Sequence, residues 1–127
     1  MHAHDPDAHI ASAQRTIRME RDAIAQLEPR IDASFAHACE LLLGVTGRVI
    51  VTGMGKSGHI ASKIAATLAS TGTPAFYVHP AEASHGDIGM ITADDAVIAL
   101  SNSGRSPEVV TLLPLLKRLG IPLVSMT

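Results

Sequence analysis

The stretch VIVTGMGKSGHIASK, residues 49–63, decides the fold of this chain. A short β-branched run, typical of a buried strand, passes through a glycine cluster into a helical pattern. The glycines Gly53, Gly55 and Gly58 have the spacing G-x-G-x-x-G, and Gly55 opens the triplet G-K-S. Such a loop could hold a dinucleotide, hold a phosphate group, or only turn the chain tightly.

Two nucleotide-binding interpretations lack a residue that they need. A dinucleotide fold places a carboxylate at the end of the second strand, about 20 residues on, to hold the ribose hydroxyls. That strand ends here at His79 and Pro80, and the nearest carboxylate, Glu82, lies beyond the proline. A Walker loop needs a glycine five places before Gly55, where this chain has isoleucine.

An anion site remains as the alternative to a simple tight turn. In a glycine loop between a strand and a helix, backbone N–H groups converge on an anion. Lys56 adds a compact positive charge, and Ser57 stands where a helix N-cap would. The loop therefore predicts an anion-binding turn that begins at Gly55.

The bulk composition narrows the class of protein. The 127 residues suffice for one domain, and a 46% hydrophobic share with few aromatic residues predicts an aliphatic core. The formal net charge of -2, with scattered basic residues, gives no sign of a nucleic-acid interface. No apolar run reaches membrane-spanning length, and the single cysteine, Cys39, fits a reducing compartment. We expect a soluble cytoplasmic protein without nucleic-acid or membrane partners.

Outward from the glycine loop, strands alternate with helices. The predicted strands are residues 48–53, 75–79, 96–100 and 123–127, and the predicted helices are 8–27, 31–43, 58–70 and 109–119. This alternation predicts an α/β fold with a parallel sheet and right-handed crossovers. We divide the chain into a disordered tail (1–9), an N-terminal helical pair (10–46) and a partial α/β core (47–127). Because a doubly wound sheet usually continues, we expect the front portion of a longer domain.

A second loop of small residues, SNSGRSPE at 101–108, also joins a strand end to a helix start. Ser106 before Pro107 is a good N-cap pair, but Ser101 and Ser103 beside Gly104 exceed what capping needs. Neutral donors at a helix N-terminus suit a phosphate monoester. Because the carboxyl ends of parallel strands share one edge, the two loops predict one crevice.

Between the two loops lies HPAEASHGD, residues 79–87. Glu82 and His85 are three apart and would be neighbours on a helix. A carboxylate and an imidazole can transfer protons as base and shuttle, and the same groups bind divalent metals. A solvated polar loop without chemistry is the third alternative.

These segments resemble the sugar isomerase (SIS) domain and, more narrowly, the arabinose 5-phosphate isomerases of Kdo and lipopolysaccharide synthesis. The resemblance rests on GMGKSGHIASKIAATLASTGTP, HPAEASHGDIGM and ALSNSGRSPEV and spans about residues 47–127. It implies a three-layer α/β/α sandwich of flavodoxin-like or Rossmann-like type. It also implies a homo-oligomer, dimer or tetramer, that interconverts D-ribulose 5-phosphate and D-arabinose 5-phosphate through an enediol.

The resemblance also implies roles for single residues. The phosphate-binding set suggested by it and by the two loops is Gly55, Ser57, Ser101, Asn102, Ser103 and Ser106. Lys56 matches an active-site lysine, while Glu82 and His85 match the polar pair beside the sugar. We take Glu82 as a candidate base, His85 as a proton shuttle and Lys56 as electrostatic help. No metal or other cofactor is implied for turnover, although His85 also matches a zinc contact in an inhibited form.

The chain departs from this family after its last predicted strand. The family continues through the rest of the sheet, with a further glutamate and histidine that could equally act as the catalytic base. Its members usually also carry a pair of CBS domains. Two other functions stay open: a non-catalytic phosphosugar sensor and an isomerase of another ketose phosphate. The sequence has no basic DNA-reading module of the kind a sensor would bring, and HPAEASHGD is richer in ionisable groups than binding needs.

Overall fold

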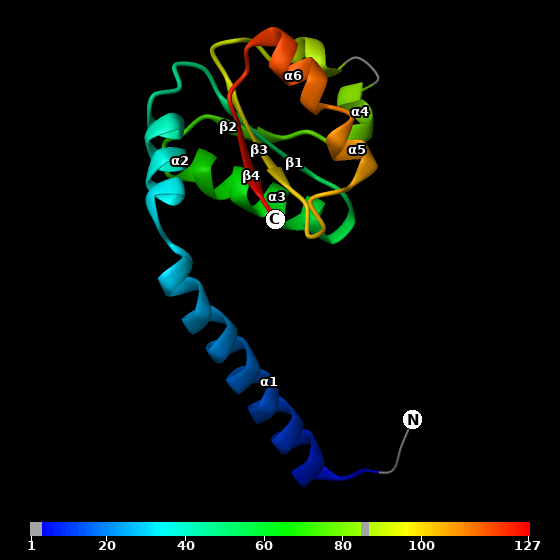
Figure 1. Cartoon of the computed structure of the whole chain (residues 1–127). Coiled ribbons are helices and arrows are strands. Elements are labelled where there is room, and N and C mark those ends of the chain that lie inside the picture. Colours follow the sequence, from blue (N-terminus) through cyan, green and yellow to red (C-terminus); the bar gives the residue numbers. More distant parts are fainter. Residues whose placement is uncertain (1–3, 85–86) are drawn as a thin grey trace. The chain divides into compact units, whose positions relative to one another are not determined.

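A computed structural model describes residues 4–84 and 87–127 of the chain. The contacts divide the chain into two compact units, residues 1–37 and 38–127. The division falls within one helix, α2 (Ala33–Leu43). Figure 1 shows the elements in chain order.

The first unit contains a long helix and a short turn. α1 (Pro6–Leu27) is capped by Asp5, whose side chain accepts a hydrogen bond from the N–H of Ala8 at 3.2 Å. The helix thus starts earlier than predicted and takes in part of the segment expected to be a disordered tail. The 3₁₀ turn η1 (Glu28–Arg30) follows, because Pro29 cannot continue the α-helical hydrogen bonds. Among the described residues, no helix is long and apolar enough to cross a membrane.

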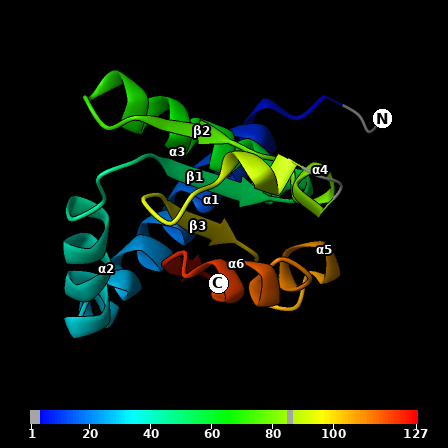
Figure 2. The same ribbon diagram turned by 90° about the horizontal axis from the view of Figure 1, so that it is seen from above.

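The second unit is built on a parallel sheet. Its strands, in spatial order, are β2 (Ala75–Tyr77), β1 (Val49–Gly53), β3 (Ala96–Leu100) and β4 (Leu123–Met126). All pairings between them are parallel, and Figure 2 shows β2, β1 and β3 side by side in this order. The predicted strands and the parallel α/β class are thus confirmed, with β2 shorter than predicted.

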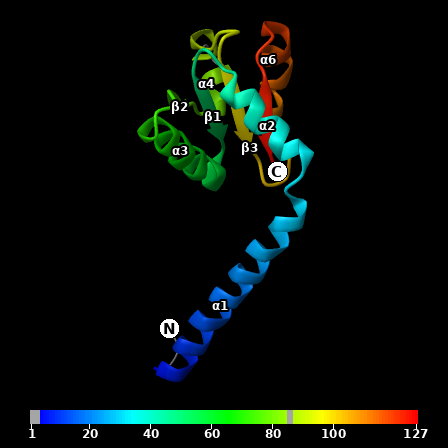
Figure 3. The ribbon, with the colours of Figure 1, turned by 90° about the vertical axis from the view of Figure 1, so that its left-hand side faces the viewer.

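Helices cover both faces of the sheet. They are α3 (Gly55–Ser70), α4 (Pro80–Ser84), α5 (Pro107–Val110) and α6 (Leu113–Leu119), with a 3₁₀ turn η2 (Asp87–Met90). Ala61 and Ala65 of α3 pack on one face, and Leu116 of α6 packs on the other. Figure 3 shows α3 and α6 on opposite sides of the strands, which is the predicted three-layer arrangement.

The core is aliphatic, as the composition predicts. Every residue of β1 and β3 is buried, and alternate residues face opposite sides of the sheet. Ile50 and Val97 belong to the cluster under α6, while Val49, Val51 and Ile98 belong to the cluster under α3. Because both faces are covered, these strands are continuous apolar runs and do not alternate with polar residues.

The helix predicted over residues 109–119 is in fact two helices. Pro114 has no N–H to donate to the carbonyl of Val110, so α5 ends there and α6 begins. The break leaves Leu113 37% exposed, although the helical spacing predicts an inward side chain. The other residues predicted to face inward are buried: Val109, Leu112 and Leu116.

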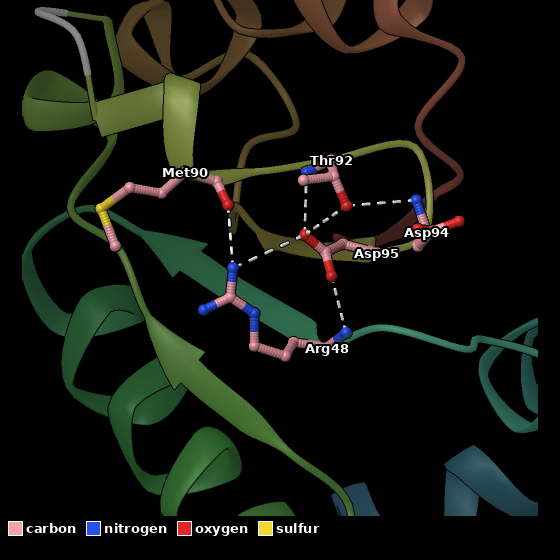
Figure 4. A network of polar contacts seen from close by, with 5 residues as sticks. All are labelled: Arg48, Met90, Thr92, Asp94 and Asp95. Carbon is pink, nitrogen blue, oxygen red and sulfur yellow. Dashed lines mark hydrogen bonds and ion pairs between the residues drawn. The ribbon is translucent and has the colours of Figure 1, made fainter.

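A buried carboxylate ties the amino ends of β1 and β3 together (Figure 4). Asp95, 2% exposed, accepts hydrogen bonds from the backbone N–H of Arg48 at 2.7 Å and of Thr92 at 2.8 Å. The guanidinium of Arg48 lies 3.9 Å from the same carboxylate and donates to the carbonyl of Met90 at 2.8 Å. Burial alone would raise the pKa of Asp95, but these hydrogen bonds and the arginine charge outweigh burial and lower it.

Candidate functional site

The glycine turn between β1 and α3 lies at the carboxyl end of the sheet. Gly55, the first residue of α3, has a φ of +57°, a left-handed conformation that favours glycine. The N-cap is Met54, so the prediction of Ser57 as N-cap is wrong. Ser57 stands instead in the first turn of the helix, where the backbone N–H groups have no intrahelical partner. With the exposed Lys56 beside them, these N–H groups form a positive helix end.

Tyr77, the single tyrosine of the chain, contacts this turn from the neighbouring strand. Its Oη donates to the carbonyl of Gly53 at 2.6 Å. Gly58 has no room for a side chain, because a Cβ there would lie 2.7 Å from the Gly53 oxygen and 2.8 Å from the Tyr77 Oη. Sequence reasoning missed this contact. The available signal was a lone tyrosine near the end of the second strand.

The serine loop after β3 folds on its own hydroxyls. Ser101, 8% exposed, accepts from the N–H of Gly104 at 3.0 Å, and Gly104 has a left-handed φ of +69°. Ser103 likewise accepts from the N–H of Arg105 at 3.0 Å. A serine that accepts in this way keeps its own proton for an outside acceptor, such as a phosphate oxygen.

Ser106 has a different role in the same loop. It is the N-cap residue of α5 and is followed by Pro107, as predicted. Its side chain makes no capping bond, however, and donates to the carboxylate of Glu108 at 3.2 Å. Ser106 therefore begins the helix through its backbone position, while its hydroxyl bonds to another side chain and does not cap the helix.

Both loops border one open depression of about 300 Å³ at the carboxyl end of the sheet. Its lining comes from α3, from the end of β3 and from the end of β4: Lys56, Ser57, Ile60, Leu100, Ser101, Asn102, Met126 and Thr127. Figure 1 shows the loop after β3 beside the start of α3. The two loops thus share one crevice, as their positions in the sequence predict.

The predicted phosphate-binding residues divide between the lining of this depression and its surroundings. Those in the lining are Ser57, Ser101 and Asn102, together with the predicted active-site Lys56. Those outside the lining are Gly55, which opens α3, and Ser103 and Ser106, which lie further along the serine loop. The structure therefore brings the first turn of α3 together with the start of the serine loop.

Glu82 lies exposed on α4, in the connection between β2 and β3. Burial first, and then the charge of Glu82, raise the pKa of Tyr77, so this carboxylate acts on the hydroxyl at the glycine turn. The Nδ1 of His79 accepts a hydrogen bond from the N–H of Ala81 at 3.1 Å. His85, the predicted shuttle and zinc contact, lies outside the described residues. Within residues 4–84 and 87–127, no group of three or more His, Cys, Asp or Glu is placed to hold a metal ion.

Comparison with known proteins gives relatives for the whole of this sheet and both loops. The chain is 71% identical over 118 residues to the arabinose 5-phosphate isomerase KdsD of Pseudomonas aeruginosa, covering 93% of this chain and 36% of that protein. It is 54% identical over 123 residues to KdsD of Francisella tularensis, covering 94% of this chain and 38% of that protein. A solved structure of an E. coli CFT073 protein in complex with arabinose 5-phosphate has a TM-score of 0.88 and 42% identity, covering 96% of this chain and 65% of that one.

The chain spans little more than a third of the length of these two KdsD relatives. Residues 42–127, which include the sheet and both loops, match the SIS domain family. The chain therefore belongs to the SIS domain family.

Proposed function

We propose that this chain carries the phosphate-binding part of an arabinose 5-phosphate isomerase, which interconverts D-ribulose 5-phosphate and D-arabinose 5-phosphate. The observation that carries the proposal is the depression in which Lys56 and Ser57 of one loop meet Ser101 and Asn102 of the other. Two relatives named for this reaction and a structural neighbour that holds arabinose 5-phosphate support it. The pathway that we propose is Kdo and lipopolysaccharide synthesis.

The phosphate of the sugar would be held by neutral donors and one cation. The N–H groups in the first turn of α3 and the hydroxyls of Ser57 and Ser101 supply the donors, and the helix end supplies a favourable field. Lys56 adds a point charge on a flexible stem. The remaining members of the proposed binding set are Gly55, Asn102, Ser103 and Ser106. Anchoring the phosphate would fix the far end of the sugar and lower the entropic part of the barrier.

Aldose–ketose isomerisation moves a proton between neighbouring carbons through an enediol. It needs a base over the carbon-bound proton, a group that moves protons between the oxygens, and positive charge near the developing enediolate. We assign these roles to Glu82, His85 and Lys56, in that order. The scheme uses no metal, and zinc bound at His85 would inhibit by occupying the shuttle.

We further propose that the protein works in the cytoplasm as a homo-oligomer, either a dimer or a tetramer. In support, apolar residues recur along α1 and are exposed: Ile10 is 56%, Ile17 is 67% and Ile24 is 67% exposed. A second copy of the chain would remove such a surface from water. Sedimentation velocity tests this point, and a monomer at micromolar concentration would contradict it.

The reaction is tested by incubating a complete protein that carries this domain with D-ribulose 5-phosphate and following the sugars by carbon NMR. We expect D-arabinose 5-phosphate to form, and we expect Glu82→Gln to abolish turnover while sugar binding persists. Glu40→Gln, which changes an exposed glutamate on α2, is the matched control and should keep full activity. Binding without turnover would indicate a phosphosugar sensor, and turnover of another ketose phosphate a related isomerase. No binding of either sugar would contradict the proposal.

A further inference from the structure

We propose that the hydroxyl of Tyr77 positions the turn between β1 and α3 and thereby sets the geometry with which that turn receives the phosphate of a sugar phosphate. The identity of the ligand rests on the proposed function. Tyr77 is not part of the lining of the depression. It is therefore a positioning residue, which acts through the turn that it contacts.

The contact of Tyr77 joins the end of one strand to the end of the next. Tyr77 is the last residue of β2 and pairs in register with Val51 of β1. Its side chain packs in the cluster under α3 and donates to the carbonyl of Gly53, the last residue of β1, at 2.6 Å. The ordinary pKa of tyrosine, about 10, already keeps the hydroxyl a proton donor at neutral pH, and burial and the charge of Glu82 raise the pKa of Tyr77 further. The bond thus holds the point at which the chain leaves the sheet.

The start of α3 packs directly against this hydroxyl and carbonyl. A Cβ at Gly58 would lie 2.8 Å from the Tyr77 Oη and 2.7 Å from the Gly53 oxygen, closer than real Cβ atoms approach other atoms. The N–H of Gly58 donates to the carbonyl of the N-cap residue at 3.2 Å and closes the first turn of the helix. Lys56 and Ser57, which line the depression, lie within that turn. A displacement of the tyrosine hydroxyl would therefore reach both of them.

A second hydroxyl nearby makes a comparable bond on the opposite face of the sheet. Thr52, 2% exposed, donates to the carbonyl of Val78 at 2.6 Å. Its side chain lines the small apolar cavity that Leu112 and Leu116 also line, on the α6 side of the sheet. Thr52 is therefore a matched control, because removing its hydroxyl reports how much such a hydrogen bond contributes to stability and to nothing else.

The test compares Tyr77→Phe with Thr52→Val in the full chain. Each change removes one hydroxyl and keeps the shape of the remaining side chain. Titrations with inorganic phosphate and with D-arabinose 5-phosphate give the Kd, and thermal unfolding gives the Tm. For Tyr77→Phe we expect the Kd for both ligands to rise about fivefold, the equivalent of one hydrogen bond. For Thr52→Val we expect a lower Tm and an unchanged Kd.

If the Kd does not rise in Tyr77→Phe, or rises as much in Thr52→Val, the inference is overturned. Hydrogen exchange at the Gly58 amide provides a measurement that needs no ligand. If the wild-type chain binds neither ligand, the proposed function fails, and exchange at Gly58, compared with the rest of α3, decides the positioning role alone. Faster exchange in Tyr77→Phe would support that role, and an unchanged rate would overturn it.

Discussion

The two ends of the parallel sheet use polar groups in opposite ways. At the amino ends of β1 and β3, the carboxylate of Asp95 is buried and accepts hydrogen bonds from Arg48 and Thr92. At the carboxyl ends, Ser101 and Ser103 accept only from their own loop in the bonds that the structure describes, and each keeps a proton to donate. One end satisfies its polar groups internally, whereas the other has donors left for a ligand. Under the proposed function, stability and binding are thus separated within one sheet.

The parallel topology explains why the separation runs in this direction. Each strand ends at the same edge, and the helix after it begins there with free backbone N–H groups. The opposite edge receives the chain as it returns from a helix, and there a buried carboxylate can meet backbone donors from two segments. Among the described residues, no buried side-chain nitrogen or oxygen lacks a hydrogen-bond partner. Side-chain donors and acceptors without a partner in the protein therefore lie where solvent reaches them.

The largest effect is expected at the stabilising end, from Asp95→Ala. The change leaves the backbone N–H groups of Arg48 and Thr92 without their acceptor, so we expect the free energy of unfolding to fall by about 3 kcal/mol. Urea denaturation measures the change. Asp94→Ala is the matched control, because Asp94 contributes only its backbone to the network of Figure 4. We expect the control to stay within about 0.5 kcal/mol of the wild type. Equal losses in both variants would contradict the role of Asp95.

A smaller effect is expected at the binding end, from Ser101→Ala. The change removes a hydroxyl that would donate to a charged phosphate oxygen, so we expect the Kd for D-arabinose 5-phosphate to rise about tenfold. Isothermal titration calorimetry measures the Kd. Ser103→Ala is the comparison variant: Ser103 belongs to the proposed binding set and loses the same kind of loop bond, but it lies outside the lining of the depression. We expect a smaller rise for Ser103→Ala. A larger one would show that the depression is not where the phosphate binds.

Most of the fold could be predicted because the two central strands, β1 and β3, are buried on both faces. Such strands appear in the sequence as short unbroken apolar runs, of which Val49 to Val51 is the clearest. Helix limits were harder to predict when apolar spacing and backbone chemistry disagreed. The apolar spacing around Leu113 continues through Pro114, but the missing N–H of the proline ends the hydrogen-bond series. The spacing therefore predicted one helix where there are two.

The candidate site could be predicted only where its residues are close in the sequence. The two loops were predictable because small residues gather directly after a strand. The contacts of Tyr77 and Asp95 were not, since they depend on the register between distant strands. Tyr77 bonds to a residue 24 positions away, and Asp95 bonds to one 47 positions away. The pattern within a single strand does not determine which residue of the next strand lies opposite.

The smallest effect is expected from acid, and it again distinguishes the two ends. The hydrogen bonds to Asp95 lower its pKa in the folded chain despite its burial, so the unfolded chain takes up a proton more readily. The stabilising contribution is fully present above about pH 4, the ordinary pKa range of aspartate, and is lost as the pH falls through the lower folded pKa. Urea denaturation at about pH 5 and about pH 3 should therefore show a larger loss of unfolding free energy for wild type than for Asp95→Asn, which cannot titrate there. Ser101→Ala should follow the wild-type profile, because neutral hydroxyls carry no proton linkage in this range. Parallel profiles for wild type and Asp95→Asn would mean that the carboxylate gains nothing from its charge in the folded state.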